Sequence, residues 1–321
     1  MINPAVIDLI KESSSIGILS HISPDGDSLG SSLALYNGLK SSDKDVKIIV
    51  DDDIPSTYHF LKSWERIEKP VKDYDFDVVI VLDSGNVERV GSSDKYLKGS
   101  NVINIDHHPS NTNFGQYNIV DSEAAATAEI IYCFLQKLGI EIDKHISECL
   151  YTGIVTDTGK FQYSNTTSTT HYIAGDLIKY DINPSKITSL IYQNNSKEKL
   201  KLKGEAIKNI EFFYDDKISC ITITQEITNR IGAKDDDFDG LVNIGRDVST
   251  VEVAIFLREE ENGKVKVSLR SKEYIDVNYI AGKFGGGGHK RASGATIQGD
   301  IYSLKNELVE ETIKLFQEIE R

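Results

Sequence analysis

Short runs of β-branched residues that end in acidic or histidine side chains constrain this sequence more than any other feature. Residues 78–82 are entirely apolar, and residues 102–105 form a second run that is apolar except for Asn104. Such runs are typical of strands that are covered on both faces of a sheet. Further strands are expected at residues 16–20 and 46–50, and helices at residues 28–39 and 124–138. This alternation predicts an α/β fold with a mostly parallel sheet.

Side chains that can bind metal ions follow directly after three of these predicted strands. The carboxyl ends of parallel strands meet at one edge of a sheet, so groups far apart in the sequence are expected to lie close together. They are His21, Asp25 and Asp27 after the first strand, Asp83 after residues 78–82, and Asp106, His107 and His108 after residues 102–105. Each acid alone has an ordinary explanation as a turn or helix-cap residue, and only the set indicates a functional site.

Five of these candidates, together with Asp157 further along the chain, offer a mixture of oxygen and nitrogen ligands without any thiolate. This mixture favours Mn²⁺, Mg²⁺, Fe²⁺ or Co²⁺ over a structural zinc site. Six ligands are too many for one tetrahedral ion but suffice for two ions that share a carboxylate, an arrangement typical of phosphoryl hydrolysis. The predicted metal ligands are His21, Asp25, Asp27, Asp83, His107 and Asp157.

A change in composition predicts a second domain. Residues 193–203 are polar and rich in lysine, as in a linker or an exposed connecting helix. The following sequence is richer in predicted strands, and Asn262-Gly263 between two alternating segments predicts a hairpin. We expect a catalytic domain over residues 1–188, a linker over residues 189–204 and a smaller α/β domain over residues 205–321.

Four consecutive glycines at residues 285–288 are the main feature of this second domain. They fit a flexible linker, a tight turn, or a loop whose backbone amides approach a phosphate closely. The cationic residues that follow favour the phosphate-binding interpretation. The predicted substrate-binding residues are Arg270, Ser271, Gly286, Gly287, Gly288, His289 and Arg291.

Composition limits the partners of the chain. Its formal net charge of -14 disfavours tight binding of long nucleic acids, but not of a small phosphorylated substrate. No apolar run approaches the roughly 20 residues that cross a bilayer, so no membrane association is expected. The three cysteines form no Cys-x-x-Cys pair, which suits a reducing cytoplasm. We therefore expect a cytoplasmic protein.

At these residues the sequence resembles the DHH phosphoesterase family, named for the triplet at 106–108. Further matches to its motifs lie at residues 21–31, 81–84 and 153–167, and residues 285–294 resemble the glycine motif of the DHHA1 domain. The resemblance covers nearly the whole chain, the motifs follow the family order, and no ligand is missing. It implies a DHH catalytic domain joined to a DHHA1 substrate-binding domain.

Within the family, the chain is similar to the bacterial nanoRNase and pAp phosphatase group. This implies an enzyme with two Mn²⁺ ions, for which Mg²⁺ or Co²⁺ are substitutes. It would hydrolyse short oligoribonucleotides to mononucleotides and remove the 3′-phosphate of pAp. A phosphodiesterase for pApA or cyclic di-AMP is an open alternative. An inactive nucleotide-binding regulator is a second one, although no ligand is lost, and a homodimer also stays open.

The resemblance also implies separate roles for the clustered residues. Asp83 would bridge the two ions, His108 would contact the scissile phosphate, and Asp106 would orient the histidines. The expected ligands of one ion are His21, Asp25 and Asp83, and those of the other are Asp27, His107 and Asp157.

Overall fold

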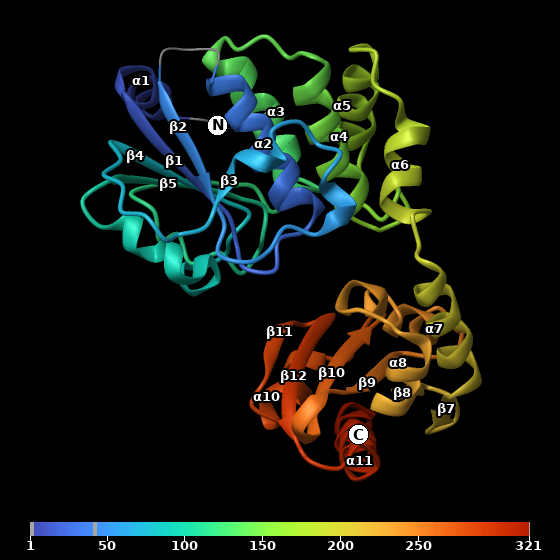
Figure 1. Ribbon diagram of the computed structural model, residues 1–321. Coiled ribbons are helices and arrows are strands. Elements are labelled where there is room, and N and C mark those ends of the chain that lie inside the picture. Colours follow the sequence, from blue (N-terminus) through green and yellow to red (C-terminus); the bar gives the residue numbers. More distant parts are fainter. Residues whose placement is uncertain (1–2, 41–43, 321) are drawn as a thin grey trace. The chain divides into compact units, whose positions relative to one another are not determined.

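The computed structural model describes residues 3–40 and 44–320, which form two compact units (Figure 1). One unit ends at Asn194 and the other begins at Asn195. This boundary lies inside the segment 189–204. Much of that segment is helical, because helix α6 (Pro184–Tyr192) ends just before the boundary and helix α7 (Lys197–Lys208) begins just after it.

The N-terminal unit contains a six-stranded sheet in which every pairing is parallel, with the order β3-β2-β1-β4-β5-β6. The predicted α/β fold is therefore confirmed. The strand order reverses between β1 and β4, which makes this the topological switch point of the sheet. The strands are β1 (Ser15–Leu19), β2 (Asp45–Ile49), β3 (Ile67–Glu68), β4 (Val78–Leu82), β5 (Asn101–Asp106) and β6 (Tyr117–Val120).

Both faces of this sheet are covered, which explains the unbroken apolar run of β4. One face packs against α2 (Gly26–Leu39) and α3 (Thr127–Leu138), and the other packs against the 3-10 segment η3 (Val87–Leu97) through Val90 and Tyr96. All five β4 residues are buried. The helices of this unit are α1 (Pro4–Glu12), α2 (Gly26–Leu39), α3 (Thr127–Leu138), α4 (Lys144–Asp157), α5 (Ser168–Ile178) and α6; two short 3-10 turns, η1 (Ser56–Tyr58) and η2 (Trp64–Arg66), follow β2.

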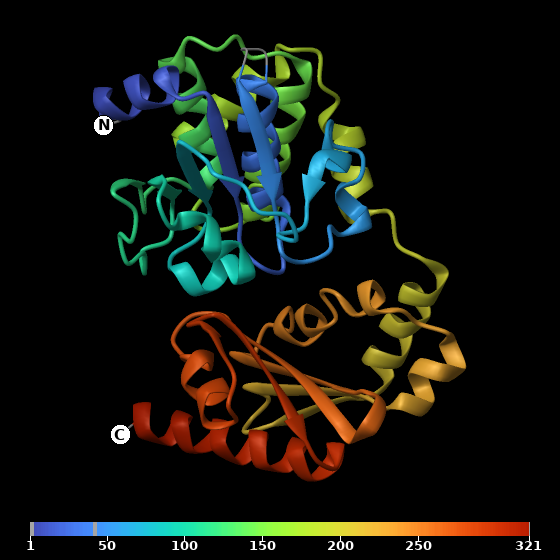
Figure 2. The ribbon, with the colours of Figure 1, turned by 60° about the vertical axis from the view of Figure 1, so that its left-hand side comes forward.

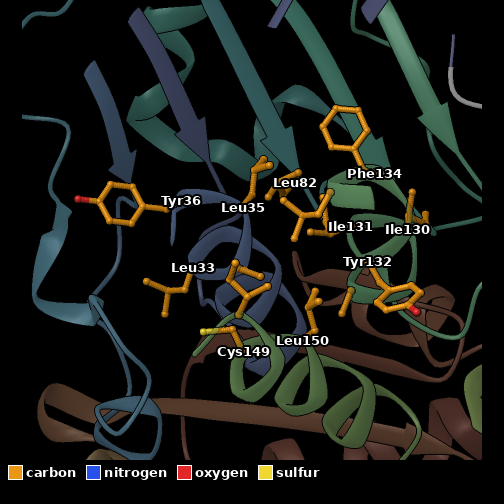
Figure 3. Packing of buried hydrophobic residues seen from close by; sticks show 14 of the residues in the cluster. Leu33, Leu35, Tyr36, Leu82, Ile130, Ile131, Tyr132, Phe134, Cys149 and Leu150 are labelled. Atoms are coloured by element: carbon orange, nitrogen blue, oxygen red, sulfur yellow. The ribbon is translucent and has the colours of Figure 1, made fainter. Parts of the chain in front are cut away.

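Helix α2 lies at the centre of the N-terminal core. Figure 3 shows Leu33 and Leu35 of α2 beside Leu82 of β4 and Leu150 of α4. Nearly all residues of α2 are buried, because the helix packs against the sheet on one side and against α3 and α4 on the other. Small residues such as Gly30 make this possible, since a Cβ atom at Gly30 would lie 2.4 Å from the carbonyl oxygen of Cys149.

The C-terminal unit contains a second six-stranded sheet with the order β11-β12-β10-β9-β8-β7. Its pairings are antiparallel except for β8 with β9. Asn262 and Gly263 both have positive φ between β9 and β10, so the predicted hairpin is confirmed. The strands are β7 (Ile210–Phe213), β8 (Ile218–Ile223), β9 (Val253–Glu259), β10 (Lys264–Ser271), β11 (Gly287–His289) and β12 (Ala292–Gln298).

Helices cover both faces of this sheet. Helix α11 packs on one face against β8 and β9, as Figure 2 shows, and α10 packs on β10 and β12. Helices α7 and α9 contribute to a separate apolar cluster with Ile221, Ala254 and Phe256. The remaining helices of the unit are α8 (Gln225–Ile231), α9 (Val242–Arg246), α10 (Val277–Lys283) and α11 (Ile301–Ile319). Among the described residues, no helix combines the length and the apolar composition that crossing a membrane requires.

Candidate metal centre

The candidate ligands of the N-terminal unit converge at the switch point of its sheet. His21 follows β1, Asp83 follows β4, and Asp106 is the last residue of β5, with His107 and His108 directly after it. The switch point between β1 and β4 is where ligands bind in open α/β sheets, because the connections there leave in opposite directions. Topology therefore explains why residues so distant in sequence meet.

The ligand atoms form overlapping groups in which all atoms lie within 4.8 Å of one another. One group joins His21, Asp25 and Asp83, a second joins Asp27, His107 and Asp157, and a third joins Asp83 with His107 and His108. The two oxygens of Asp83 face different sides. Its Oδ2 lies 3.4 Å from His21 Nε2, and its Oδ1 lies 3.6 Å from His107 Nε2.

Two of the imidazoles next to Asp83, those of His21 and His107, are held with Nε2 toward the acids. Nδ1 of His21 lies 2.7 Å from the carbonyl oxygen of Ile22, and Nδ1 of His107 lies 3.2 Å from that of Ala124. A carbonyl oxygen only accepts, so each Nδ1 carries the proton in the neutral ring and Nε2 keeps its lone pair. This is the tautomer that a metal-binding histidine needs.

The start of α2 positions two acids. Asp25 is the N-cap, and its Oδ1 accepts hydrogen bonds from the backbone N–H groups of Asp27 and Ser28. Gly26 lies between the two acids, where a Cβ atom would be 2.4 Å from the Thr156 side chain. The turn thus directs Asp25 toward His21, while Asp27 is fully buried in the first turn of the helix.

Asp27 also caps a different helix. The N-cap residue of α3, Ala126, has no side-chain cap of its own. Instead the Asp27 carboxylate accepts hydrogen bonds from the backbone N–H groups of Thr127 and Ala128, at 2.6 and 2.9 Å. A negative charge is favourable at the positive end of a helix, so α3 fixes and stabilises this buried acid.

The backbone of Asp83 adopts an uncommon conformation. Its φ is +55°, in the left-handed region that few residues other than glycine adopt. Aspartate tolerates this region better than most residues, because its short side chain can form local hydrogen bonds. The conformation turns the chain sharply after β4 and brings the Asp83 side chain to the switch point, a placement found often at functional sites.

His108 differs from His107 in its partner. Its Nδ1 lies 2.6 Å from Asp106 Oδ1, and Asp106 is fully buried. Asn111 donates to the other oxygen of Asp106 and to Oδ1 of Asn104. Neither Asn111 nor Asn104 was identified from the sequence, since asparagines in a loop and in a strand carry no distinctive spacing.

The acids of the centre repel one another in the metal-free protein. Burial, together with the charges of Asp83 and Asp157, raises the pKa of Asp27 well above its usual value. Burial also raises the pKa of Asp157, against the opposing hydrogen bond from His107. These buried carboxylates lack sufficient positive charge around them.

The pKa of His107 is raised and that of Asp83 is lowered, so both shifts favour the charged form. Burial would lower the pKa of His107, but the hydrogen bond to Asp157 and the charges of Asp27 and Asp83 raise it to about 11. Burial would likewise raise the pKa of Asp83, yet His21, His107 and His108 hold it well below the usual value. The metal-free centre therefore takes up a proton to balance its acids, and bound cations would supply the same balance. Its oxygen and imidazole donors fit divalent metal ions.

The candidate substrate-binding residues of the C-terminal unit lie near the C-terminal end of β10, away from the hairpin turn. Arg270 and Ser271 end β10, and Ser271 is hydrogen bonded to the backbone of Lys290 and Arg291. The guanidinium of Arg291 donates to the carbonyl oxygen of Ile275. These residues therefore form one local cluster.

The second half of the glycine run lies in the edge strand β11, so the run is not a flexible linker. Gly287 and Gly288 pair with Gly294 and Ser293 of β12, and His289 pairs with Ala292. Glycine is required by close approach, because a Cβ atom at Gly286 would lie 2.1 Å from the carbonyl oxygen of Gly294. Its contact with a phosphate remains a prediction.

Comparisons with known proteins identify the family to which both units belong. The family model described as DHH family, N-terminal domain, matches residues 15–154, and that of the DHHA1 domain matches residues 220–319. A relative from Thermus thermophilus is 36% identical over 287 residues, which span 88% of this chain and 84% of the relative. The chain belongs to the DHH/DHHA1 phosphoesterase family. The Thermus thermophilus relative is named bifunctional oligoribonuclease and PAP phosphatase NrnA.

Other proteins similar to this DHH phosphoesterase cover most or nearly all of its length. A Bacillus subtilis relative with the same name is 30% identical and spans 86% of this chain and 87% of its own. The crystal structure of an exopolyphosphatase-related protein from Bacteroides fragilis matches with a TM-score of 0.89 and 30% identity, covering 99% of this chain and 96% of that chain. Both domains of the phosphoesterase are thus shared with these proteins.

Proposed function

We propose that this protein is a two-metal, Mn²⁺-dependent phosphoesterase that hydrolyses short oligoribonucleotides to mononucleotides and removes the 3′-phosphate of pAp. It acts as an exoribonuclease and as a 3′(2′),5′-bisphosphate nucleotidase. The names of the relatives from Thermus thermophilus and Bacillus subtilis support the substrate class. We place its action in the cytoplasm, where RNA decay produces short oligonucleotides.

The position of Asp83 carries the proposal of two ions. One of its oxygens faces His21 and the other faces His107, so this single carboxylate can be a ligand in both of the neighbouring ligand groups. We assign one ion to His21, Asp25 and Asp83, and the second to Asp27, His107 and Asp157, with Asp83 shared. Bound divalent ions would supply activation of water and neutralisation of charge on the phosphoryl oxygens.

His108 is the residue that we assign to the scissile phosphate. Asp106 holds its Nδ1, so the Nε2 edge is the one that it presents to a substrate. A proton on this Nε2 can be donated in a hydrogen bond to a phosphoryl oxygen, or transferred to the leaving group. Asp106 would contribute by orienting this ring, and Asn111 by orienting Asp106.

The cluster around Arg270 and Ser271 is our candidate for binding the rest of the substrate. It comprises Arg270, Ser271, Gly286, Gly287, Gly288, His289 and Arg291. A guanidinium is suited to a phosphate because its donors are planar and always charged. Within this cluster, Arg270 lines a cavity of about 240 Å³, whose other lining residues include Lys266, Ser268 and three aspartates.

A substrate panel tests the proposal. The purified chain, freed of metal with a chelator and resupplied with Mn²⁺, Mg²⁺ or Co²⁺, is offered a diribonucleotide, pAp, pApA, cyclic di-AMP, pyrophosphate and a long single-stranded RNA. We expect the fastest turnover with Mn²⁺ and the short RNA, together with release of phosphate from pAp. Faster turnover of pyrophosphate or of the long RNA would contradict the proposal, and fastest turnover of cyclic di-AMP would favour a second-messenger phosphodiesterase.

A further inference from the structure

Thr127, the first residue of α3, contacts two of the acids at the metal centre. Its backbone N–H donates to Asp27 Oδ2 at 2.6 Å, and its hydroxyl lies 2.9 Å from Asp83 Oδ1. Thr127 is fully buried. Asp27 belongs to α2 and Asp83 follows β4, so one residue of a third element links two acids that are distant in the sequence.

The hydroxyl of Thr127 has a clear direction of donation. Both oxygens of the ionised Asp83 carboxylate can only accept, so the threonine O–H is the donor. The neighbouring imidazoles of His21 and His107 cannot replace it when they are neutral, because each Nδ1 proton is directed to a backbone carbonyl. The Thr127 hydroxyl thus holds Asp83 whatever the protonation of these rings.

The Asp83 oxygen that accepts the Thr127 hydrogen bond is the one that faces the group of Asp27, His107 and Asp157. Asp83 Oδ1 lies 3.6 Å from His107 Nε2, whereas Oδ2 lies 3.4 Å from His21 Nε2. A carboxylate rotates readily about the bond to its Cβ atom. The Thr127 hydroxyl, as a fixed donor at Oδ1, favours the rotation in which Oδ1 faces His107 and Oδ2 faces His21.

We propose that Thr127 is a positioning residue that sets the bridging orientation of the Asp83 carboxylate for two metal ions. The inference rests on the proposed two-metal function and adds a residue outside the ligand set. Asp27 does not depend on the Thr127 side chain in the same way. It also accepts hydrogen bonds from the Ala128 N–H and the Ser31 hydroxyl. Changing the side chain should therefore disturb the shared acid more than the unshared one.

Side-chain variants of graded donor strength test this inference. Thr127→Val keeps the shape but removes the donor, Thr127→Cys leaves a weak donor, and Thr127→Ser keeps the hydroxyl. Thr312→Val is the matched control, because Thr312 is also fully buried in a helix and donates to the Leu308 carbonyl oxygen in the other unit. Circular dichroism and thermal unfolding of each metal-free variant establish that it is folded.

The measurement is the binding of Mn²⁺ alone to the full chain. It is monitored by the paramagnetic resonance signals of free Mn²⁺ and of the bound Mn²⁺ pair. Loss of a residue that orients a ligand typically weakens metal binding by about 10–100-fold, and we expect this for Thr127→Val together with loss of the signal from the coupled pair. Affinity should decrease in the order Thr, Ser, Cys, Val, with the control at the wild-type value.

Two outcomes would overturn the inference. A folded Thr127→Val variant with wild-type Mn²⁺ affinity and an intact pair signal would contradict it. If that variant does not fold, equal affinities of the Ser and Cys variants would also contradict it, since their donors differ in strength. Failure of the proposed function would look different, because the wild-type chain itself would then bind no Mn²⁺ pair.

Discussion

Asp83 in the N-terminal unit and Glu252 in the C-terminal unit are both buried acids, but their partners differ. Asp83 lies among three imidazoles and accepts one hydrogen bond from Thr127. Glu252 accepts hydrogen bonds from the backbone N–H groups of Glu273, Tyr274 and Ile275. Backbone donors cannot change their charge or leave, so they serve structure. Titratable neighbours such as imidazoles can exchange protons for metal ions. A buried acid therefore indicates a metal site by its titratable neighbours and not by its burial.

The substitution Asp83→Asn should give the largest effect of the comparison. The neutral amide cannot bridge two cations, and activation by bound metal supplies several kcal/mol, so kcat/KM should fall by about 10³-fold. Activity at saturating Mn²⁺ and the metal content of the purified protein measure this. A variant that keeps both ions and more than about a tenth of the activity would contradict the shared-ligand assignment.

The substitution His108→Asn should lower kcat by about 10²-fold, which is a usual contribution of a general acid or hydrogen-bond donor. The Mn²⁺ content should remain that of the wild type, because His108 is assigned to the phosphate. The exposed histidine His145 offers the matched control, His145→Asn, for which neither quantity should change. Loss of one ion from the His108 variant would instead favour the group of Asp83, His107 and His108 as ligands.

The pH dependence of metal binding follows from the pKa shifts. His107, with a pKa raised to about 11, is protonated in the metal-free protein at neutral pH and must lose this proton to bind a metal. The raised pKa of Asp27 and of Asp157 acts in the same direction. Mn²⁺ affinity should therefore weaken as pH falls, by about tenfold per pH unit for each displaced proton. Calorimetric titrations from pH 8 to pH 6 should show proton release, and a constant affinity would contradict the assignment.

The substitution Glu252→Gln should have the smallest effect on activity and completes the comparison. An amide offers its nitrogen where a carboxylate oxygen accepted backbone hydrogen bonds, so the free energy of unfolding should fall by about 1–3 kcal/mol. Chemical denaturation measures this change. Turnover and Mn²⁺ affinity of the folded variant should match the wild type. A loss of activity at unchanged stability would show that the backbone-bound acid is functional after all.

The fold and the position of the candidate site could be predicted from the sequence because both depend on local patterns. The apolar run of β4 predicted a strand covered on both faces, and the structure confirms it. Strand ends meet at one edge of a parallel sheet, so the approach of His21, Asp83 and His107 followed from topology alone. Their assignment to particular ions remains a prediction.

Other features could not be predicted because they depend on contacts between distant elements. Thr127 looks like an ordinary helix residue, and its two hydrogen bonds to acids exist only after α3 packs on α2. Strand β3 has only two residues, which is too short to show the alternating or continuous apolar pattern that predicts a strand. The glycine run was ambiguous, because glycine fits a flexible linker, a tight turn and a loop that approaches a phosphate alike. The pairing of Gly287 and Gly288 with β12 argues against the linker, and the phosphate contact stays a prediction.

The close approach of α2 and α4 has a mechanical consequence. A Cβ atom at Gly153 would lie 2.7 Å from Asp27 Oδ1, and one at Gly30 would lie 2.4 Å from the backbone of α4. Asp157 is the last residue of that same helix. The distance between two predicted metal ligands, Asp27 and Asp157, thus depends on how closely the glycines let α2 and α4 approach. A single methyl group wedged between these helices would widen the centre without altering any of its donors.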